Sequence, residues 1–501
     1  MSLRFILGAL QVEGATVFSA AELTAPYQGF YGAESSFQRI SGIADELTRK
    51  YRDAGYLLSR VILPAQGQLD PRNARIRLVA LEGYISAIEY QGEAELVDRF
   101  KSYWTRVEQK LLALRPLKHS DFERELLLLQ DLPGLIVSSR FKEADVPGGS
   151  VLVLELTHKP LDLSANWGNT GTQSAGHGIA TLTASLNALP FIGSKTTLSY
   201  SQANDRREYY STQIAHSQQF ANGLIASASY AYSNSPDPDS DFARLFDYET
   251  QSKTFTAGVS YPFIRSRDTN LSAGLSYEHR NSESRLIGER YTTDRLRNLI
   301  FNINFDFSDE WGGTTQIIPS LTRGLNWSDA TDRDPNASTP IAPAVFTKGN
   351  LYLSRNQSLP HNLSLFVAAE AQYTDSPLSS YNRFSLGGNQ FGRGYDPGII
   401  ENDHGLAASL EGRWNGTLSN MSIQPFLFID WGKTWADKRM NGSLQKEYLA
   451  SAGLGARLTG KLPGTTPLRF SLTAFVGKPL RAVSDAHTSD ERYMLQGVLS
   501  F

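Results

Sequence analysis

The sequence predicts two small α/β domains, each with the order β-α-α-β-β, followed by a sixteen-stranded antiparallel transmembrane β-barrel. Three observations predict this fold class. Near residue 160 the spacing of apolar residues changes from a mixture of helical and strand periods to regular alternation. Short and long connectors then alternate along the rest of the chain, which ends in an apolar stripe that closes on Phe501.

Composition excludes several classes of protein. The chain has 501 residues with 48 Lys and Arg against 51 Asp and Glu, and this near-balance argues against a nucleic-acid-binding protein. Because it has no cysteine, it has neither a disulfide framework nor a thiolate metal site. No run reaches the roughly 18 apolar residues of a membrane-spanning helix. A content of 25 Phe, 22 Tyr and 41 Gly suits a transmembrane β-barrel.

Residues 1–83 form the first predicted α/β domain. Its elements are, in order, a strand over 5–12, a short helix, a helix over 37–51, and strands over 56–63 and 74–81. Ser19 is expected to cap the short helix, because Glu22 follows at the spacing of a capping box. Apolar residues at helical spacing predict the second helix.

Residues 84–159 form the second predicted α/β domain and repeat the same order. Its elements are a strand over 85–90, helices over 96–114 and 120–130, and strands over 136–143 and 150–158. Ser120 is expected to open the second helix. The two domains share a pattern of elements without obvious sequence identity.

Residues 160–501 form the predicted barrel. Alternate residues are apolar in stripes over 255–261, 299–307 and 363–373, so each of these strands has one apolar face. We expect the apolar faces to contact lipid, at positions such as Leu182, Phe301, Val367, Leu427 and Trp431. A soluble β-sandwich shows the same alternation, so alternation alone leaves that alternative open.

Connector lengths favour the barrel. Seven short connectors alternate with eight polar ones, most of them long, including those over 281–297 and 374–403. Fifteen connectors imply sixteen strands, and an even number is typical of outer-membrane barrels.

The last predicted strand carries a stripe that ends at the C-terminus. Tyr493, Leu495, Gly497, Leu499 and Phe501 alternate with mostly polar residues. Outer-membrane barrels commonly end in this way, and we expect the barrel assembly machinery to bind the stripe during biogenesis.

No motif in the sequence predicts an enzyme. Residues 455–461 nearly match a phosphate-binding loop, but Leu462 stands where Ser or Thr would hold magnesium, and Pro463 stands where a helix would begin. The eight His residues show no metal-ligand spacing. We therefore expect no catalytic residue, no cofactor and no metal ion.

A Gly-rich stretch over 387–395 is the first part of a candidate site. It lies in the longest connector and contains Arg393, Gly394 and Tyr395. Taken alone, such a stretch is more often a flexible surface loop. A functional role needs a partner elsewhere in the chain.

A predicted strand over 426–432 offers that partner. Leu427, Ile429 and Trp431 form its apolar face, so Asp430 points to the other side. If lipid lies outside the barrel, that side is the lumen. A lumenal carboxylate favours a cation, and Arg393 on the long connector is the candidate.

With these motifs the chain resembles an outer-membrane transporter of the two-partner (type V) secretion pathway, within the superfamily of POTRA-bearing barrels. Arg393-Gly394-Tyr395 is similar to the family's inward-folded loop motif, and Phe428-x-Asp430-x-Gly432 to its strand motif. Family members usually have Val before the Arg, where this chain has Gly392, which weakens the apolar contact expected there.

The resemblance implies POTRA domains over 1–83 and 84–159, in the periplasm, and a sixteen-stranded barrel over 160–501 with an inward-folded loop over 375–403. It implies a bacterial outer-membrane pore that recognises a partner exoprotein and secretes it unfolded, without nucleotide hydrolysis. Such exoproteins are haemolysins, adhesins or contact-dependent inhibition toxins. Relatives also carry an N-terminal plug helix, which we expect to be absent or removed here.

The same resemblance implies the partners of the chain. They are the secretion domain of the exoprotein, outer-membrane lipid and the barrel assembly machinery; we expect no nucleic acid and a monomeric transporter. The exoprotein would add a strand to a POTRA sheet edge, for which Ile136, Val137 and Arg140 are the candidates.

Three other functions remain possible from the sequence. An outer-membrane insertase of the same superfamily normally has more than two POTRA domains. A passive porin needs no α/β domains before its barrel. A soluble β-sandwich or adhesin would not show sixteen segments with alternating connector lengths.

Overall fold

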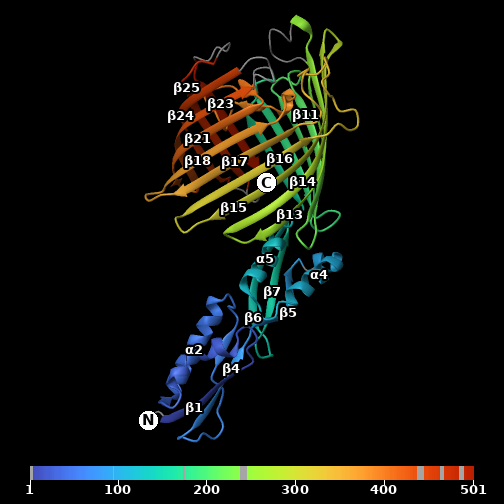
Figure 1. The fold of residues 1–501 in the computed structure, drawn as a ribbon. Coiled ribbons are helices and arrows are strands. Elements are labelled where there is room, and N and C mark those ends of the chain that lie inside the picture. The colour runs from blue at the N-terminus through green and yellow to red at the C-terminus, as the bar shows by residue number, and fades with distance from the viewer. Residues whose placement is uncertain are drawn as a thin grey trace. The chain divides into compact units, whose positions relative to one another are not determined.

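The computed structural model describes residues 4–93, 95–172, 175–236, 245–436, 445–462, 468–483 and 490–501. Its contacts divide the chain into two compact units, which meet in the sequence at Lys159 and Pro160 (Figure 1). The first unit contains two α/β folds, and the second is a closed β-barrel.

The first α/β fold has a four-stranded sheet in the order β2-β1-β4-β3. Its elements are β1 (Arg4–Glu13), α1 (Ala20–Thr24), η1 (Gln28–Phe30), β2 (Glu34–Ser36), α2 (Phe37–Asp53), β3 (Arg60–Ile62) and β4 (Ala74–Leu81). The capping box of Ser19 and Glu22 is confirmed. Helix α2 buries Ile40, Ile43 and Leu47 against the sheet because these side chains recur at helical spacing.

The predicted start of the strand over 56–63 is wrong, because the observed strand begins later. Only Arg60–Ile62 is a strand, because Tyr56 and Ser59 take part in a turn. The Tyr56 amide donates to the carbonyl of Tyr51, and the Ser59 amide donates to the carbonyl of Tyr56.

The second α/β fold has a three-stranded sheet in the order β5-β7-β6. Its elements are β5 (Tyr84–Gly92), α3 (Glu95–Arg99), α4 (Lys101–Leu112), α5 (His119–Gln130), β6 (Leu135–Glu143) and β7 (Gly149–His158). Strand β7 pairs in parallel with β5 and antiparallel with β6, which leaves β5 and β6 at the sheet edges.

Two helix predictions in this fold are corrected. The single helix expected over 96–114 is divided at Phe100, whose backbone leaves the helical region, into α3 and α4. Ser120 is not the cap of α5, because the helix already begins at His119 with Lys118 at the N-cap. No helix in the described part of the chain is long and apolar enough to cross a membrane.

The Glu82 carboxylate, which directly follows β4, joins the end of the first α/β fold to Thr16, Val17 and Tyr51 by hydrogen bonds. Glu82 accepts hydrogen bonds from the Thr16 amide (2.7 Å), the Thr16 hydroxyl, the Val17 amide (3.0 Å) and the Tyr51 hydroxyl (2.7 Å). Partial burial raises the pKa of Glu82, but the hydrogen bonds from Thr16, Val17 and Tyr51 outweigh it and hold this pKa below its usual range.

Glu82→Gln is therefore expected to destabilise this fold at neutral pH. A carboxyl group with a lowered folded-state pKa stabilises the fold above its unfolded pKa of about 4.3, and the stabilisation is lost as the pH falls through the folded pKa. Protease resistance during heating should separate variant from wild type at neutral pH and bring them together at acidic pH. Glu46→Gln, at an exposed position of α2, is the control. An equal loss at both pH values would contradict a role for the charge.

The barrel consists of sixteen antiparallel strands, as predicted. They are β8 (Leu161–Gly168), β9 (Ile179–Asn187), β10 (Ser194–Ala203), β11 (Tyr210–Gln219), β12 (Ile225–Ser235), β13 (Glu249–Arg265), β14 (Thr269–Leu286), β15 (Glu289–Ser308), β16 (Gly313–Gly324), β17 (Thr347–Ser358), β18 (Leu363–Thr374), β21 (His404–Trp414) with its continuation β22 (Gly416–Leu418), β23 (Met421–Ala436), β24 (Gln445–Lys461), β25 (Arg469–Pro479) and β26 (Arg492–Ser500). Both β21 and β22 pair with β23, so they form one strand interrupted at Asn415. Pairing of β26 with β8 closes the barrel.

The long connector predicted over 281–297 is wrong. Strands β14 and β15 continue through it and meet at a tight turn of Ile287 and Gly288, which both have positive φ. The side chains there are mostly polar on both faces, and a strand that extends beyond lipid needs no apolar face. Its polar composition therefore resembled that of a loop.

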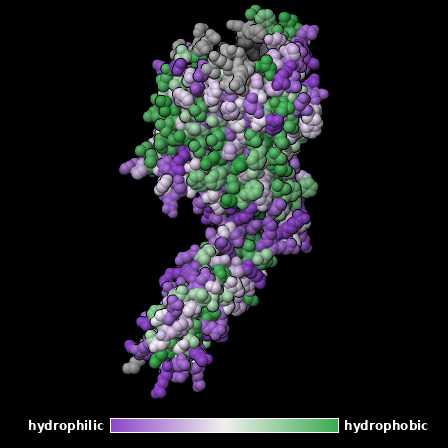
Figure 2. Space-filling model, in the orientation of Figure 1, coloured by the Kyte–Doolittle hydropathy of each residue, from purple (hydrophilic) through white to green (hydrophobic). Residues whose placement is uncertain are grey.

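The outer face of the barrel is apolar. Leu182, Phe301, Val367, Leu427 and Trp431 are all exposed, with Leu182 at 62% and Leu427 at 65%. The visible side of the barrel is accordingly mainly hydrophobic across its middle (Figure 2). An apolar outer surface of this kind is the one that a transmembrane β-barrel presents to lipid.

A matched pair of substitutions tests this orientation. Leu182→Arg on β9 is expected to cost about 2–4 kcal/mol of folding free energy in lipid vesicles. The neighbouring Thr183→Arg should cost far less, since Thr183 lies on the opposite face of the same strand. Urea titration of the folded fraction measures both. A larger loss for Thr183→Arg would show that the two faces are inverted.

Candidate functional site

The connector between β18 and β21 folds back against the inner face of the barrel. It contains η2 (Ser380–Asn382) and the hairpin of β19 (Phe384–Leu386) and β20 (Ile400–Asn402). Apolar side chains of this connector pack against the wall, in a cluster that includes Leu386, Phe391, Tyr395, Ala368, Ala407 and Leu449. Since Ala407 lies opposite Gly432 on β23, on the face away from Leu427, the connector occupies the lumenal side.

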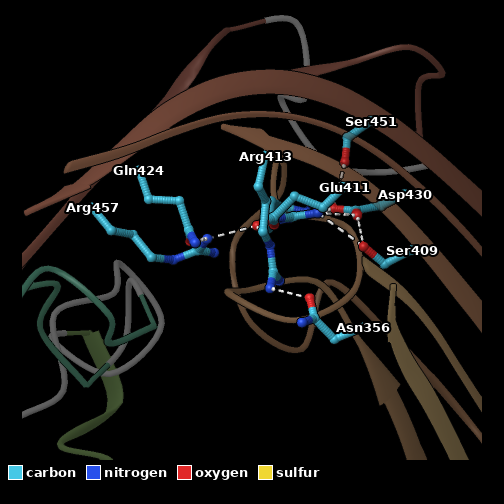
Figure 3. Close-up of polar contacts among 9 residues, drawn as sticks. Asn356, Ser409, Glu411, Arg413, Gln424, Asp430, Ser451 and Arg457 are labelled. Atoms are coloured by element: carbon cyan, nitrogen blue, oxygen red, sulfur yellow. Dashed lines mark hydrogen bonds and ion pairs between the residues drawn. The ribbon is translucent and has the colours of Figure 1, made fainter. Parts of the chain in front are cut away.

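Arg393 at the tip of this connector contacts Asp430 on β23. Its Nε lies 3.0 Å from Asp430 Oδ2 and its Nη2 lies 2.8 Å from Oδ1, which is a bidentate pair. The Arg393 amide also donates to Oδ2, at 2.9 Å. The Asp430 side chain is fully buried, at 0% exposure. Hydroxyl groups of Ser409 and Ser451 complete its hydrogen bonds (Figure 3).

Glu411 on β21 is a second carboxylate partner that sequence reasoning missed. It binds Arg393 Nη1 and accepts hydrogen bonds from Arg413 Nε and Arg457 Nη1, each at 2.7 Å. Three guanidinium groups and two carboxylates therefore form one network (Figure 3). A signal was present, because Leu406 and Leu410 mark the outer face of β21 and place Glu411 on the inner one.

Aromatic rings support the three guanidinium groups of this network. Arg393 lies 3.7 Å from the ring centroid of Phe428, and Arg457 lies 4.1 Å from that of Phe426. Arg413 lies 4.3 Å from the centroid of Phe366. These cation–π contacts gain strength where water is excluded. They give Phe428, a motif residue, a direct contact with Arg393.

Tyr395 and Gly394 fit the connector closely to the wall. The Tyr395 hydroxyl lies within hydrogen-bond distance of the backbone carbonyls of Ala450 (2.8 Å) and Arg481 (2.7 Å) and donates its single proton between them. A Cβ atom at Gly394 would lie 2.7 Å from the carbonyl carbon of Lys478. Gly477 on β25 is equally constrained, because its Cβ would lie 2.7 Å from the Arg393 carbonyl oxygen. Sequence reasoning missed Gly477.

Glycine at two further positions has a steric reason. Gly432 faces Leu386 of the connector, which would collide with a Cβ atom. Gly392 has a φ of +84°, and its carbonyl accepts a hydrogen bond from the Tyr395 amide at 2.9 Å. A Cβ there would lie 2.9 Å from Leu449 Cδ1. Gly392 thus allows a turn that a valine would strain.

The first half of the connector is held by a different set of contacts. The Asn382 carbonyl accepts hydrogen bonds from Lys348 Nζ (3.0 Å) and Gln372 Nε2 (3.1 Å). Tyr381 donates to Glu278 on β14 at 3.4 Å and lies beneath the Arg280 guanidinium group. The sequence analysis did not find this second anchor.

Three of the predicted C-terminal residues lie on the outer face of β26, and Phe501 follows the last residue of this strand. Tyr493, Leu495, Leu499 and Phe501 are all exposed, so the stripe faces outward. Its strand is the one that closes the barrel against β8.

The predicted client-binding residues do not share one face. Ile136 is 62% exposed on the edge strand β6, and Arg140 is also exposed, donating to Gln91 Oε1 at 2.9 Å. Val137 is only 5% exposed and packs in the core of its fold. Alternate residues of a strand point to opposite faces, so Ile136 and Arg140 share the exposed face of β6 and Val137 offers only its backbone at that edge.

Metal binding has no support in the described ranges. They contain no group of three or more His, Asp or Glu side chains arranged to hold a metal ion.

Comparisons with family models match both units. The model described as haemolysin secretion/activation protein ShlB/FhaC/HecB matches residues 148–458. The model of the ShlB-type POTRA domain matches residues 5–83.

Individual relatives are distant but extensive. The heme/hemopexin transporter protein HuxB of Haemophilus influenzae (strain 86-028NP) is 23% identical over 476 residues, covering 92% of this chain and 80% of that protein. The outer membrane transporter CdiB of Dickeya dadantii (strain 3937) is 22% identical, covering 82% of this chain and 72% of that protein. The structure of CdiB from Escherichia coli matches with a TM-score of 0.78 at 19% identity, covering 99% of this chain and 91% of that one.

Proposed function

The chain belongs to the haemolysin secretion/activation protein family of two-partner secretion transporters, and from this premise we propose that it exports one partner exoprotein as an unfolded chain, without hydrolysing nucleotide. It is an outer-membrane barrel whose POTRA domains lie in the periplasm. The single observation that carries the proposal is the connector over 375–403, which Arg393 fastens inside the lumen to Asp430 and Glu411.

The dimensions of the pore support an unfolded client. A barrel of sixteen strands encloses a lumen that admits an extended chain, whereas a folded domain is too wide. Folding of the exoprotein at the cell surface would then bias its movement outward. We propose that this folding, with binding at the periplasmic side, drives export.

Recognition of the client is proposed at the edge strand β6. Ile136 and Arg140 are exposed there, and β6 pairs with β7 on one side only. An extended segment of the exoprotein can add a strand to such an edge through backbone hydrogen bonds. Val137 would contribute its backbone alone.

We propose a two-partner exoprotein as the client, of the haemolysin, adhesin or contact-dependent inhibition type. Relatives of this chain include a heme/hemopexin transporter protein and the outer membrane transporter CdiB. We further propose that the transporter is a monomer surrounded by outer-membrane lipid. The barrel assembly machinery would insert it by binding the stripe that ends at Phe501.

Secretion in a reconstituted host tests this function. The chain is expressed together with a candidate two-partner exoprotein from the same genome, in an Escherichia coli host that lacks both. Full-length exoprotein is expected in the medium only when the chain is present. Fusion of a disulfide-locked domain to the exoprotein should block export if the client passes unfolded.

Two results would overturn the proposal. Retention of the exoprotein in the periplasm despite an assembled barrel would exclude it as the client. A fall in the amounts of other outer-membrane barrels after deletion of the gene, with secretion unchanged, would favour the insertase alternative.

A further inference from the structure

The barrel has two chemically different inner walls. Along 181–185 of β9, 197–201 of β10, 211–217 of β11, 227–231 of β12 and 254–258 of β13, every second residue is Ser, Thr, Gln, Ala or Gly. Register pairs these residues with one another across neighbouring strands, as in Ser199 with Gln213 and Ser229 with Thr256. We name this surface the hydroxyl wall.

The hydroxyl wall faces the lumen. The residues between its members include Leu182, Leu198 and Ile214, which are exposed on the lipid side. Thr256 of the wall lies opposite Glu278, and Glu278 contacts Tyr381 of the connector inside the barrel. No residue of the hydroxyl wall as defined carries a charge, and Lys195, which pairs opposite Ser217, borders it on β10.

The wall formed by β17 to β24 is of the opposite kind. Its inner face carries Glu411, Asp430, Arg413 and Arg457 with the rings beneath them, and most of these groups are buried under the connector over 375–403. In Figure 1 the green strands β11 to β14 and the orange strands β18 to β24 lie on different sides of the barrel. Members of the hydroxyl wall such as Ser199, Gln213 and Ser229 stay accessible.

Hydroxyl groups of this wall are held in place by one another. Thr181 pairs with Ser201 at 2.8 Å, Thr183 with Ser199 at 3.2 Å, and Ser185 with Thr197 at 3.0 Å. One pair uses one donor and one acceptor, so each hydroxyl pair keeps further capacity for hydrogen bonds. The wall can therefore bond amide and carbonyl groups of a passing backbone in place of water.

A polypeptide can cross the barrel only if its contacts with the inner wall form and break easily. A pore site must bind well enough to admit its cargo and weakly enough to release it. Guanidinium–carboxylate and cation–π contacts, which dominate the other wall, would hold charged and aromatic side chains of a client. Closed pairing of all strands also prevents a client from adding a strand to the wall.

We propose that the hydroxyl wall is the track along which an extended polypeptide crosses the barrel. The ligand class is an unfolded chain of any side-chain composition, bound through short-lived hydrogen bonds to its backbone. The proposal deepens the proposed function and rests on it. Short side chains leave space for the client chain along the track. Because the track residues are uncharged, they bind client segments of different sequence similarly.

Photocrosslinking in secreting cells tests the contact. A benzoylphenylalanine replaces Ser199 or Ser229 while the partner exoprotein, jammed by a disulfide-locked domain, occupies the pore. Crosslinks to the exoprotein are expected from both positions. The matched controls are Gln316, which faces the lumen on β16, and Leu198, which faces lipid. Crosslinks from Gln316 but from neither Ser199 nor Ser229 would overturn the track.

A bilayer measurement tests the wall independently of secretion. The probe is a Gly/Ser-rich peptide of about 30 residues, which is longer than the membrane when extended, with lysines at one end. Ser229→Glu should lengthen the current blockades caused by this peptide about tenfold. Ser229→Ala, which removes one hydroxyl group of the wall, should shorten them slightly, and Gln316→Glu should leave them nearly unchanged. Blockades insensitive to Ser229→Glu would overturn the track, even if the exoprotein is secreted normally. Loss of secretion with the expected blockades would count against the exporter function alone.

Discussion

Replacement of Arg393 by alanine is expected to abolish most secretion while the barrel still assembles. The bidentate contact to Asp430 is buried, so the change leaves a carboxylate without its cation. An exposed ion pair contributes at most about 1 kcal/mol, but removal of one partner from a buried pair costs about 3–5 kcal/mol. That is enough to release the tip of the connector from the wall.

The Glu411 contact makes the two single substitutions unequal. Asp430→Ala leaves Arg393 bound to Glu411, whereas Arg393→Ala leaves Asp430 without a cation, with only neutral donors: the amide of residue 393 and the hydroxyl groups of Ser409 and Ser451. We therefore expect a strong loss of secretion for both variants and the larger loss for Arg393→Ala. Pore conductance should change in both, because the connector occupies the lumen.

A double-mutant cycle decides whether the residues act as a pair. Secretion and conductance are measured for wild type, Arg393→Ala, Asp430→Ala and the double variant. Arg457→Ala is the matched control, since it removes a 2.7 Å contact to Glu411 without touching the connector, and it should secrete nearly normally. Additive single effects would show that Arg393 and Asp430 do not act together.

Deletion of residues 1–159 is expected to leave an inserted barrel that secretes no exoprotein. Contacts divide the chain at this point, so the barrel loses few of its own interactions. The edge strands on which recognition is proposed are lost with the first unit. Heat-modified migration of the barrel in gels reports assembly, and exoprotein in the medium reports secretion.

A point variant tests recognition of the exoprotein in a chain that keeps residues 1–159. Ile136→Lys places a charge on the exposed side of β6 and should reduce secretion, whereas Leu57→Lys changes another exposed apolar residue, in the first fold, and should not. Undiminished secretion by the truncated barrel would remove recognition from the first unit altogether. Undiminished secretion by Ile136→Lys alone would move it away from the β6 edge.

Local regularities made much of the architecture predictable. The period of two places Leu427 and Asp430 on opposite faces of β23, because strand side chains alternate regardless of what surrounds them. The capping box at Ser19 and the buried face of α2 follow from contacts within four residues. The number of strands could be predicted from the connector lengths, although the connector predicted over 281–297 belongs to β14 and β15.

Tertiary contacts determined the features that no local pattern of apolar residues indicates. Hairpin β14–β15 extends to Ile287 because strand pairing needs only backbone groups. Its polar side chains show no alternation of apolar residues, so the sequence pattern did not indicate strands there. Glu411 meets Arg393 because a connector of irregular sequence folds back onto β21, and Gly477 is needed because that connector passes close to β25. Strand parity thus determined which side chains face the lumen. Which of them meet there was decided by the path of the connector over 375–403, since its conformation depends on the packed wall and not on its own sequence period.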